Sequence, residues 1–529
     1  MSVADLVGAR PDPVAEPPVE GTPRRGAPRW AAVGAALVAA VLLVGLVLRF
    51  WTRSDLWLDE ALTVNIARLP VGSIPGALRH DGSPPLYYFL LHFWMLAFGT
   101  GDLAIRSLSG VFGVATLPLA WVAGRRLGGR LVAWTATLLV ASSPFAVRYS
   151  TENRMYMMIV VLTLVGFLAL DSALRHPTVP RLMGVAVVTG LLLLSHYWTL
   201  YLVAAVMVAL AWTARRGRPE QRRPALACLA AVTGGFALLV PWLAILVFQL
   251  RHTGTPWSEP ASFSAMVNAV SDFAGGGTNQ GRALGLLFFA LAGLGLAGMA
   301  IDGRRIELDL RTRPPGRGIA FVSFATLALA IVAGFGLRSA FTARYTAVMF
   351  APFILLVSLG LTTFADRRVR TGVLAAAVVF GLAGSAQNVT TNRTQAARLV
   401  STLQAVARPG DVVVYCPDQL GPATSRLLPP DEYRQITFPR GTGPRFVDWV
   451  DYATHNRAAS PRAFAADVLA QAGGHQIFLV WSPDYRTFEN KCDVLEASLA
   501  RARPHSKALL LQQPARYFEH ANLVRYWPS

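Results

Sequence analysis

Two adjacent carboxylates, Asp59 and Glu60, follow the first long apolar run of the chain, in the stretch Trp57-Leu58-Asp59-Glu60-Ala61. A carboxylate beside a bilayer is costly to desolvate unless it is paired or faces water. We therefore expect the pair to face a polar cavity at the membrane surface, where a carboxylate can act as a general base. The alternative interpretation is a solvated loop acid without a catalytic role, and position alone does not separate the two.

The elements that must position this pair are membrane helices. The chain has 529 residues, of which 53% are hydrophobic and only 15% charged, and its mean hydropathy is +0.42. A soluble enzyme carries charge on roughly a quarter of its residues. The formal charge of +19 comes from Arg clusters between apolar runs, as the positive-inside rule predicts for cytoplasmic loops. We therefore expect a polytopic membrane protein whose basic residues reflect its topology. Its expected partner is the lipid bilayer, and no nucleic-acid partner is expected.

Apolar runs and basic clusters together predict about eleven spans. Residues 1–29 are rich in Pro and Gly and are expected to form a disordered cytoplasmic tail before a first span at about 30–50. The run from Pro84 to Phe98 is short, and as a span it would place the Arg125 cluster outside. It is therefore predicted to be an aromatic helix lying along the interface. The next spans are predicted at about 103–123, 131–147 and 155–174, and the last at about 371–386.

The C-terminal part of the chain is more polar than the rest. Residues 390–529 have ordinary polarity and are predicted to form a soluble extracytoplasmic α/β domain, after a transmembrane catalytic domain at 30–389. Helices are expected at 396–406 and 492–503, and strands at 411–415 and 476–481. An extracytoplasmic disulfide between Cys416 and Cys492 and a pair of free thiols fit the sequence about equally well.

This topology places polar residues from several separate loops on the outer face. Neither charged residues within spans, as in a channel, nor broken helices in repeated halves, as in a secondary transporter, are evident. The pattern instead fits a transferase that takes its donor from a lipid phosphate. The outer set consists of Arg53, Asp55, Asp59, Glu60, His80, Asp81, Tyr149, Glu152, Arg154, Tyr156, His196, Tyr197, Arg338, Arg344 and Tyr345.

Five motifs carry a family resemblance over about the first 360 residues. They are Trp57-Leu58-Asp59-Glu60-Ala61, the stretch Asp81-Gly82-Ser83-Pro84-Pro85-Leu86-Tyr87-Tyr88, the stretch Tyr149-Ser150-Thr151-Glu152-Asn153-Arg154-Met155-Tyr156, and the pairs His196-Tyr197 and Arg344-Tyr345. In this order they resemble the branch of the GT-C glycosyltransferases that contains the protein O-mannosyltransferases and the aminoarabinose transferases. The resemblance implies a polytopic GT-C fold and the use of polyprenyl-phosphate sugars at the outer face of the cytoplasmic membrane.

The resemblance also implies roles for particular residues. Asp59 matches the catalytic base of the first outer loop, and Glu152 matches an acidic residue that assists substrate binding. In the aminoarabinose transferases a Lys before the paired prolines contacts the lipid phosphate, whereas this chain has Ser83 there. That role is expected to pass to His80, Arg154 or Arg344.

Each assignment has a structural alternative. Glu60 would solvate or cap a helix without taking part in chemistry, because two adjacent carboxylates do not easily share one task. His196 and Tyr197 would be interfacial anchors, and Arg344 would be a residue at the flank of a span whose charged end reaches the interface. The sequence does not choose between these interpretations.

The resulting prediction is an integral membrane glycosyltransferase that moves one sugar, of mannose or arabinofuranose type, to a hydroxyl of a cell-envelope glycan, lipid or protein. The catalytic residues are predicted to be Asp59, Glu60 and Glu152. The predicted substrate-binding residues are His80, Asp81, Tyr149, Arg154, Tyr156, His196, Tyr197, Arg344 and Tyr345. No cofactor is expected to be required. No spacing typical of a zinc site is evident, although Asp59 and Glu152 could supply part of an oxygen site for a divalent cation.

Three rival functions remain open at this point. The first two are a flippase for lipid-linked sugars and a non-catalytic scaffold for envelope assembly. The third is a glycan ligase or polymerase that uses a lipid-diphosphate oligosaccharide.

Overall fold

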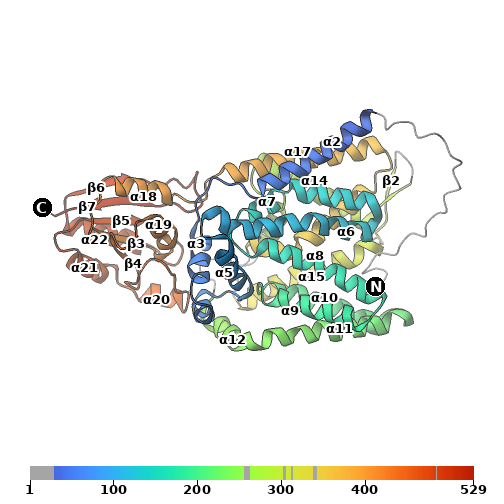
Figure 1. Ribbon diagram of the computed structural model, residues 1–529, viewed down its shortest axis with the longest axis horizontal. Coiled ribbons are helices and arrows are strands. Elements are labelled where there is room, and N and C mark those ends of the chain that lie inside the picture. Colours follow the sequence, from blue (N-terminus) through green and yellow to red (C-terminus); the bar gives the residue numbers. More distant parts are fainter. Residues whose placement is uncertain are drawn as a thin grey trace.

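The computed structural model describes residues 29–254, 262–301, 305–310, 314–337, 342–483 and 485–528. The expected N-terminal tail at 1–28 and Arg338 lie outside these residues. Figure 1 shows a bundle of long helices at one end of the molecule and a smaller domain with a sheet at the other end, with short helices between them.

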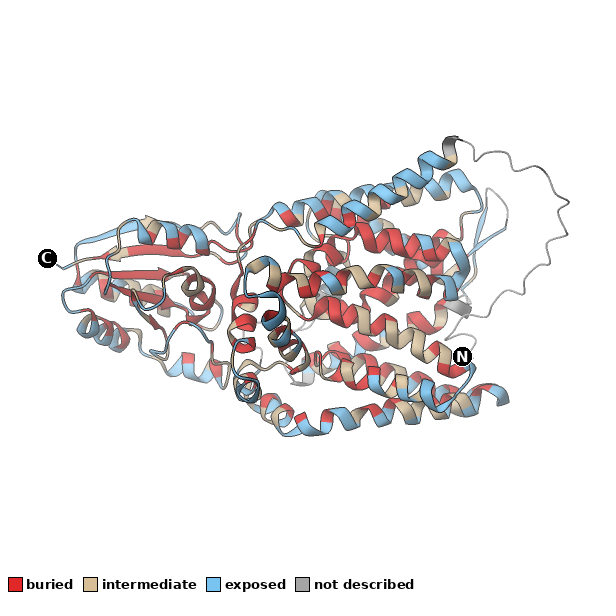
Figure 2. Ribbon diagram, viewed as in Figure 1, coloured by how far each residue is buried: buried red, intermediate tan, exposed pale blue. Residues whose placement is uncertain are grey.

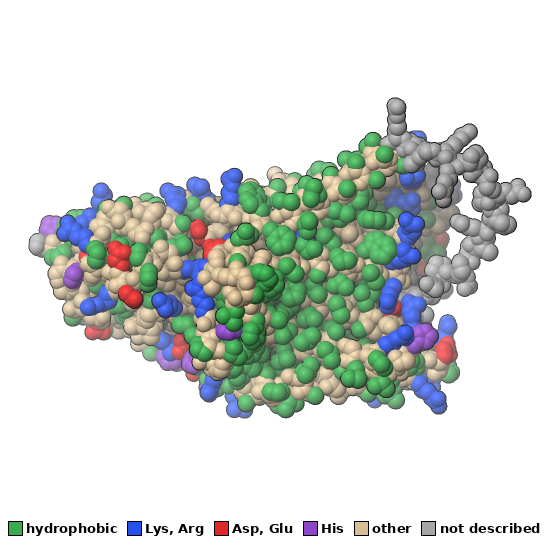
Figure 3. Space-filling view, viewed as in Figure 1, with side chains coloured by type: hydrophobic (Ala, Val, Ile, Leu, Met, Phe, Trp, Pro, Cys, Tyr) green, Lys and Arg blue, Asp and Glu red, His purple; other side chains and the backbone are tan. Residues whose placement is uncertain are grey.

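Long apolar helices form the bundle. Their bounds are α2 (Arg29–Leu48), α6 (Asp102–Ser142), α8 (Tyr156–Arg175), α9 (Val179–Leu193), α10 (Thr199–Arg216), α11 (Pro219–Gly235), η2 (Phe236–Trp242), α12 (Leu243–His252), α14 (Asn279–Ala297), α15 (Pro314–Leu337), η3 (Ala343–Thr346), α16 (Ala347–Leu361) and α17 (Arg367–Thr390). In the described part of the chain, nine stretches are long and apolar enough to cross a membrane. Figure 3 shows their apolar side chains as a broad belt, with basic side chains along the edge away from the C-terminal domain.

One of these stretches crosses the bundle twice. In α6, residues Gly128 and Gly129 leave the helical conformation, and Gly129 has φ of 78°, which a residue without Cβ adopts without strain. The two limbs approach closely at Gly124, where an added Cβ would lie 2.8 Å from Ala133 Cα. With α6 counted twice and the shorter apolar helix α9 included, the described residues make eleven passes, as the sequence predicted.

The third predicted span ends earlier than expected. The sequence predicted a helix at 131–147, but α6 stops at Ser142 and a separate short helix, α7 (Pro144–Ser150), follows. The residue before a proline avoids the helical conformation, and Ser143 is indeed extended, with its hydroxyl accepting from Ala146 N. This break allows α7 to carry the next loop across the end of the bundle.

Short helices cover the end of the bundle that faces the C-terminal domain. They are α3 (Leu58–Ala67), η1 (Val71–Ser73), α4 (Ile74–Asp81), α5 (Leu86–Phe98) and α13 (Phe263–Asp272). The predicted interfacial helix is α5, which buries Tyr87, Tyr88 and Leu91 and exposes Phe93 and Leu96. At the opposite end of the bundle, β1 (Gly298–Ala300) and β2 (Ile306–Leu308) form a small antiparallel pair.

The C-terminal part is an α/β domain, as predicted. Its elements are α18 (Ala396–Gln404), β3 (Val412–Cys416), η4 (Asp418–Leu420), α19 (Gly421–Leu427), β4 (Arg434–Thr437), α20 (Tyr452–Ala458), α21 (Pro461–Ala472), β5 (Ile477–Trp481), α22 (Lys491–Ala502), β6 (Ser506–Leu510) and β7 (Asn522–Tyr526). The strand order is β4-β3-β5-β7-β6. Strand β3 pairs in parallel with β4 and β5, while β7 is antiparallel to β5 and β6.

The central strands are apolar on both faces because helices cover both. Val413 and Phe478 pack with α18, whereas Val414 and Leu479 pack in the cluster that contains α21 and α22, and Figure 2 shows these strands as buried. A disulfide joins Cys416 at the end of β3 to Cys492 in α22, which resolves the alternative that the sequence left open. The sequence did not predict β4, β6 and β7, which are short or partly polar.

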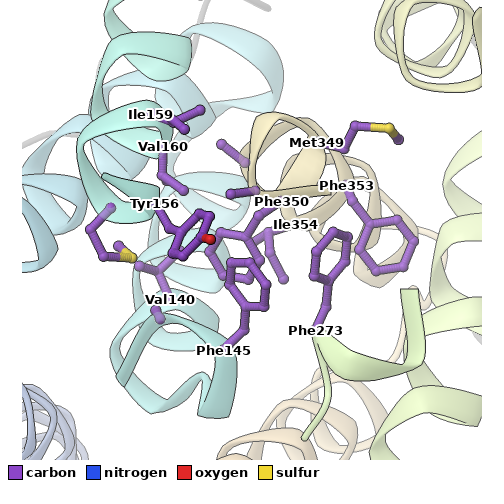
Figure 4. Packing of buried hydrophobic residues seen from close by; sticks show 14 of the residues in the cluster. Val140, Phe145, Tyr156, Ile159, Val160, Phe273, Met349, Phe350, Phe353 and Ile354 are labelled. Atoms are coloured by element: carbon purple, nitrogen blue, oxygen red, sulfur yellow. The ribbon is translucent and has the colours of Figure 1, made fainter. Parts of the chain in front are cut away.

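A buried aromatic cluster supports the short helix α7 from within the bundle. Phe145 stacks on Phe350 of α16 with ring centroids 4.8 Å apart, and its edge meets Phe273 at 4.9 Å. Tyr156, the first residue of α8, belongs to the same hydrophobic cluster (Figure 4). The floor of the predicted site is therefore built from four segments that come from three separate parts of the chain.

Candidate active site

The first turn of α3 carries both carboxylates that the sequence singled out. Successive residues of an α-helix point about 100° apart, so the two side chains point in different directions. Glu60 is completely buried, whereas the side chain of Asp59 is 18% exposed. The adjacent acids therefore occupy two different environments.

Glu60 is held by an arginine from the membrane domain. Arg106 Nε lies 2.7 Å from Glu60 Oε1 and Nη2 lies 2.6 Å from Oε2, a bidentate pair, and the backbone N–H of Asn153 donates to Oε1. Burial alone would raise the pKa of Glu60, but Arg106 and Arg393 outweigh it and hold the pKa below its usual value. Both oxygens are occupied, so this carboxylate joins the first and second outer loops and is poorly placed to accept a proton from a substrate.

Glu152 lies in the same buried layer. Its Oε2 is 3.2 Å from Arg148 Nε and 3.7 Å from Arg393 Nη1. Arg393 also approaches Glu60 at 3.8 Å and donates to the carbonyl and the hydroxyl of Thr151. The two acidic loops thus share one arginine.

Arg393 is a residue that sequence reasoning missed. It lies just after α17, in the connection to the C-terminal domain, and is 1% exposed. Burial, together with the charge of Arg148, lowers its pKa to about 9. An isolated arginine between a span and a soluble domain gives no periodic or motif signal, and only the folded chain shows that it bridges the two acids.

Asp59 faces Arg344, one of the residues predicted to bind the phosphate of the sugar donor. Arg344 Nη1 lies 3.0 Å from Asp59 Oδ2, and both side chains are nearly but not fully buried, at 17% and 18% exposure. The guanidinium also lies 5.5 Å from the ring centroid of Trp57. Asp59 is therefore a partly accessible carboxylate beside a cation that could divide its charge between Asp59 and an anionic ligand.

A second cation, Arg154, contacts α3 one turn after Asp59. Its Nη1 donates to Thr63 Oγ1 at 2.8 Å and to the Tyr88 hydroxyl at 3.3 Å. Tyr88 in turn donates to Asp81 at 2.7 Å, and burial raises the pKa of Asp81. Arg154 Nε is buried and has no hydrogen-bond partner among the described residues.

Tyr149, Tyr156, His196 and Tyr345 form an aromatic wall beside these charges. Tyr149 and Tyr156 have ring centroids 4.8 Å apart, and His196 and Tyr345 have centroids 4.6 Å apart. The buried Tyr156 hydroxyl, like Arg154 Nε, has no partner in the described part of the chain. The unpartnered Arg154 Nε and Tyr156 hydroxyl, with Arg344 nearby, fit a ligand with several acceptor oxygens, such as a phosphate or a sugar.

His196 is uncharged in this wall. Burial, with the nearby charges of Arg154 and Arg344, lowers the pKa of its imidazole to about 3, and its Nδ1 accepts from Trp198 N. The ring can therefore pack or form hydrogen bonds with a ligand, but at neutral pH it does not neutralise a phosphate.

Two predicted binding residues point elsewhere. His80 is about half exposed, and its Nδ1 lies 2.9 Å from Asp448 Oδ1 of the C-terminal domain. The Tyr197 hydroxyl pairs with Gln249 and accepts from Trp242 Nε1. Their described contacts join loops and domains, so the structure does not bring them into the charged cluster around Asp59.

The cluster holds no obvious metal cage. Among the residues that the structure describes, no group of three or more His, Cys, Asp or Glu side chains has ligand geometry. Asp59, Glu60 and Glu152 each have an arginine partner. The arrangement can bind an anion through Arg344 and Arg154 and can remove a proton through Asp59.

Comparisons with known proteins find a matching family model and similar solved structures. Residues 82–245 match the family model described as dolichyl-phosphate-mannose-protein mannosyltransferase, while no curated protein matches the chain. The structure is similar to that of ArnT from Cupriavidus metallidurans in the apo state, with a TM-score of 0.61 and 13% identity over 93% of this chain and 98% of that chain. ArnT from the same organism bound to undecaprenyl phosphate gives a TM-score of 0.55 and 13% identity over 94% and 98%. The family model thus confirms the resemblance over residues 82–245, and the structural similarity shows a shared fold.

Proposed function

We propose that this chain, a multi-pass membrane glycosyltransferase of the GT-C type, transfers one sugar from a polyprenyl-phosphate donor to a hydroxyl of a cell-envelope acceptor. The observation that carries this proposal is the pairing of a partly accessible carboxylate, Asp59, with Arg344 at 3.0 Å. The similar ArnT structure that contains undecaprenyl phosphate supports a lipid phosphate as the kind of donor carrier.

In the proposed reaction Asp59 accepts the proton of the acceptor hydroxyl while that oxygen attacks the anomeric carbon. The bond between this carbon and the phosphate oxygen breaks, and the phosphate leaves as an anion. Attack in line inverts the anomeric configuration. The leaving phosphate needs little protonation, so orientation and charge neutralisation supply most of the rate enhancement.

Arg344 and Arg154 are proposed to receive the phosphate. Arg344 faces Asp59, and Arg154 offers a buried Nε without a described partner. Fixed cations in a site with little water stabilise a developing anion more strongly than they would in solution. Of the three candidates for the position held by Lys in the aminoarabinose transferases, His80 is the least suited, because its ring pairs with Asp448.

Glu60 and Glu152 are proposed to position the loops. Both are 1% exposed or less and are compensated by buried or partly buried arginines. Uncompensated buried carboxylates would be strongly destabilising, so these pairs fix the second outer loop against α3. We assign proton transfer to Asp59 alone.

The active site and C-terminal domain are proposed to lie on the extracytoplasmic face of the cytoplasmic membrane. Helix α3, which carries Asp59 and Glu60, lies at the end of the bundle that faces the C-terminal domain (Figure 1). Arg clusters at the opposite end, as at Arg125, Arg126 and Arg130, fit a cytoplasmic side.

A direct test uses purified protein with synthetic short-chain polyprenyl-phosphate mannose and arabinofuranose and with envelope extracts as acceptors. The expected result is a glycosylated product with inverted anomeric configuration and release of polyprenyl phosphate, which chelation of divalent cations does not prevent. Transport of the donor lipid across a proteoliposome membrane without formation of a glycosylated product would indicate a flippase. Turnover only with lipid-diphosphate oligosaccharides would indicate a ligase. Either outcome would reject the proposal.

A further inference from the structure

The first turn of α3 is capped by a residue of the C-terminal domain. The N–H groups that begin a helix have no partner within it, and Trp57 at the N-cap position supplies no side-chain hydrogen bond. Leu58 N instead donates to Glu519 Oε1 at 3.0 Å. The residue directly before Asp59 is therefore held by a carboxyl group near the other end of the chain.

Glu519 is itself fixed on several sides. Its N–H donates to the carbonyl of Arg393, and its carbonyl accepts from Gln395 N, both at 2.9 Å. The adjacent Phe518 places its ring against the edge of Trp57, with centroids 5.4 Å apart. Glu519 is thus tied through its backbone to the connection after α17 and through its side chain to the start of α3.

Glu519 is suited to accept this hydrogen bond in its neutral, protonated form. Burial, with the charges of Asp59 and Glu60, raises its pKa to about 8, against favourable hydrogen bonds from Thr394 and Leu58. A protonated carboxyl retains acceptor capacity on its carbonyl oxygen. A glutamine amide, which also carries a carbonyl oxygen, should therefore replace it in this contact.

We propose that Glu519 is a positioning residue for the reaction proposed above: it fixes the first turn of α3 and so directs the Asp59 carboxylate toward the acceptor. This inference rests on the proposed function. It gives the C-terminal domain a direct part in arranging the proton acceptor.

The test compares Glu519→Ala and Glu519→Gln in the full-length protein. Hydrogen exchange at residues 58–62 reports the cap without any reaction. In Glu519→Ala this exchange should accelerate about tenfold, the effect of losing a helix cap of ordinary strength. The turnover number should fall about 10- to 100-fold at unchanged donor KM, because small errors in position are costly. In Glu519→Gln the exchange rate at residues 58–62 and the turnover number should both stay within about twofold of wild type near pH 7.

Arg426→Ala is the matched control for loosened domain contact. Arg426 Nη2 joins the C-terminal domain to Asp102 at 2.7 Å and to the Thr100 carbonyl at 3.2 Å, without a hydrogen bond to Leu58. The inference predicts that this variant leaves exchange at residues 58–62 and turnover unchanged.

Three results would overturn the inference. They are unchanged exchange in Glu519→Ala, faster exchange with normal turnover, and an Arg426→Ala variant that reproduces the whole effect. Absence of sugar transfer by the wild type would instead reject the proposed function, and exchange would still decide whether Glu519 holds the α3 turn.

Discussion

Arg344 and Asp59 form an ion pair in which Nη1 lies 3.0 Å from Oδ2, and they come from the start of the tenth pass and from the first outer loop. The pair joins the two functions that a transferase of this kind must combine, because Asp59 is proposed to receive the proton and Arg344 to receive the departing phosphate. We expect donor binding to draw the Arg344 guanidinium partly onto the phosphate, and the weaker pairing would leave Asp59 more available as a base.

Substitution of Arg344 should weaken donor binding. Loss of one hydrogen bond to a charged group costs about 1.5 to 3 kcal/mol, so Arg344→Ala should bind polyprenyl phosphate about 10- to 150-fold more weakly. Arg344→Lys keeps the charge but loses the forked geometry and should lie between. Titration of the purified variants with lipid phosphate measures the effect.

Arg53→Ala provides the control for this measurement, because Arg53 is exposed and its guanidinium lies over Trp51. It should bind donor as the wild type does. Wild-type affinity in Arg344→Ala would move the phosphate site away from this arginine.

Arg393 should be important for stability. It is buried between Glu60 and Glu152, and removal of one partner from a buried ion network costs about 3 to 5 kcal/mol. Arg393→Gln should therefore lower the melting temperature markedly, with a smaller loss in Arg393→Lys. Arg398→Gln, which removes an exposed hydrogen bond to Gln513, should change stability by less than about 0.5 kcal/mol. Equal stability of Arg393→Gln and the wild type would show that the network contributes nothing to the fold.

The raised pKa of Glu519 predicts a pH-dependent difference in stability. An unfolded glutamate ionises near pH 4.5, whereas Glu519 in the folded protein has a pKa of about 8. The unfolded state therefore loses its proton first, and the wild type loses stability relative to Glu519→Gln as the pH rises from about 4.5 to about 8. The melting temperature of Glu519→Gln minus that of the wild type should increase across this interval and then level off.

Glu489→Gln, at an exposed position of the same domain, should show no such trend. If the difference between Glu519→Gln and the wild type is the same at pH 5 and pH 8, the carboxyl is not held in its neutral form.

Single cysteines should report the topology. Glu60 and Glu152 are too buried to label, so exposed positions are needed, and the buried native Cys228 should be replaced. An impermeant maleimide should reach cysteines at Ser73 and Ser401 in intact cells, and those at Glu220 and Ala365 only after permeabilisation. Labelling of Glu220→Cys from outside would invert the proposed orientation.

The sequence predicted the membrane fold well because its signals are local. Apolar run length and Arg clusters located eleven passes and the short apolar helix α5. The third predicted span, 131–147, runs past the end of α6 because its pattern gave no weight to Pro144, before which Ser143 is extended. Strands β6 and β7 were missed because partly exposed strands alternate less clearly than buried ones such as β3.

The candidate site was only partly predictable. The motifs identified Asp59, Arg154 and Arg344 as candidate site residues, but spacing in the sequence does not reveal which carboxylate pairs with which arginine. The capture of Glu60 by Arg106, and the entry of Arg393 and Glu519 into the same region, depend on contacts between distant segments. Such contacts leave no periodic pattern in a single sequence.

The most direct test of the account is sugar transfer by Asp59→Asn. The amide keeps the shape of the side chain but cannot accept the proton, so turnover should fall by about 10² to 10⁴ while donor affinity stays nearly unchanged. Asp55→Asn, at a nearby outer carboxylate, should retain turnover, and Glu60→Gln should lose stability more than turnover. Transfer from a synthetic polyprenyl-phosphate sugar, measured beside donor binding, decides the matter. Near wild-type turnover in Asp59→Asn, with abolition in Glu152→Gln or Glu60→Gln, would contradict the assignment of Asp59 as the base.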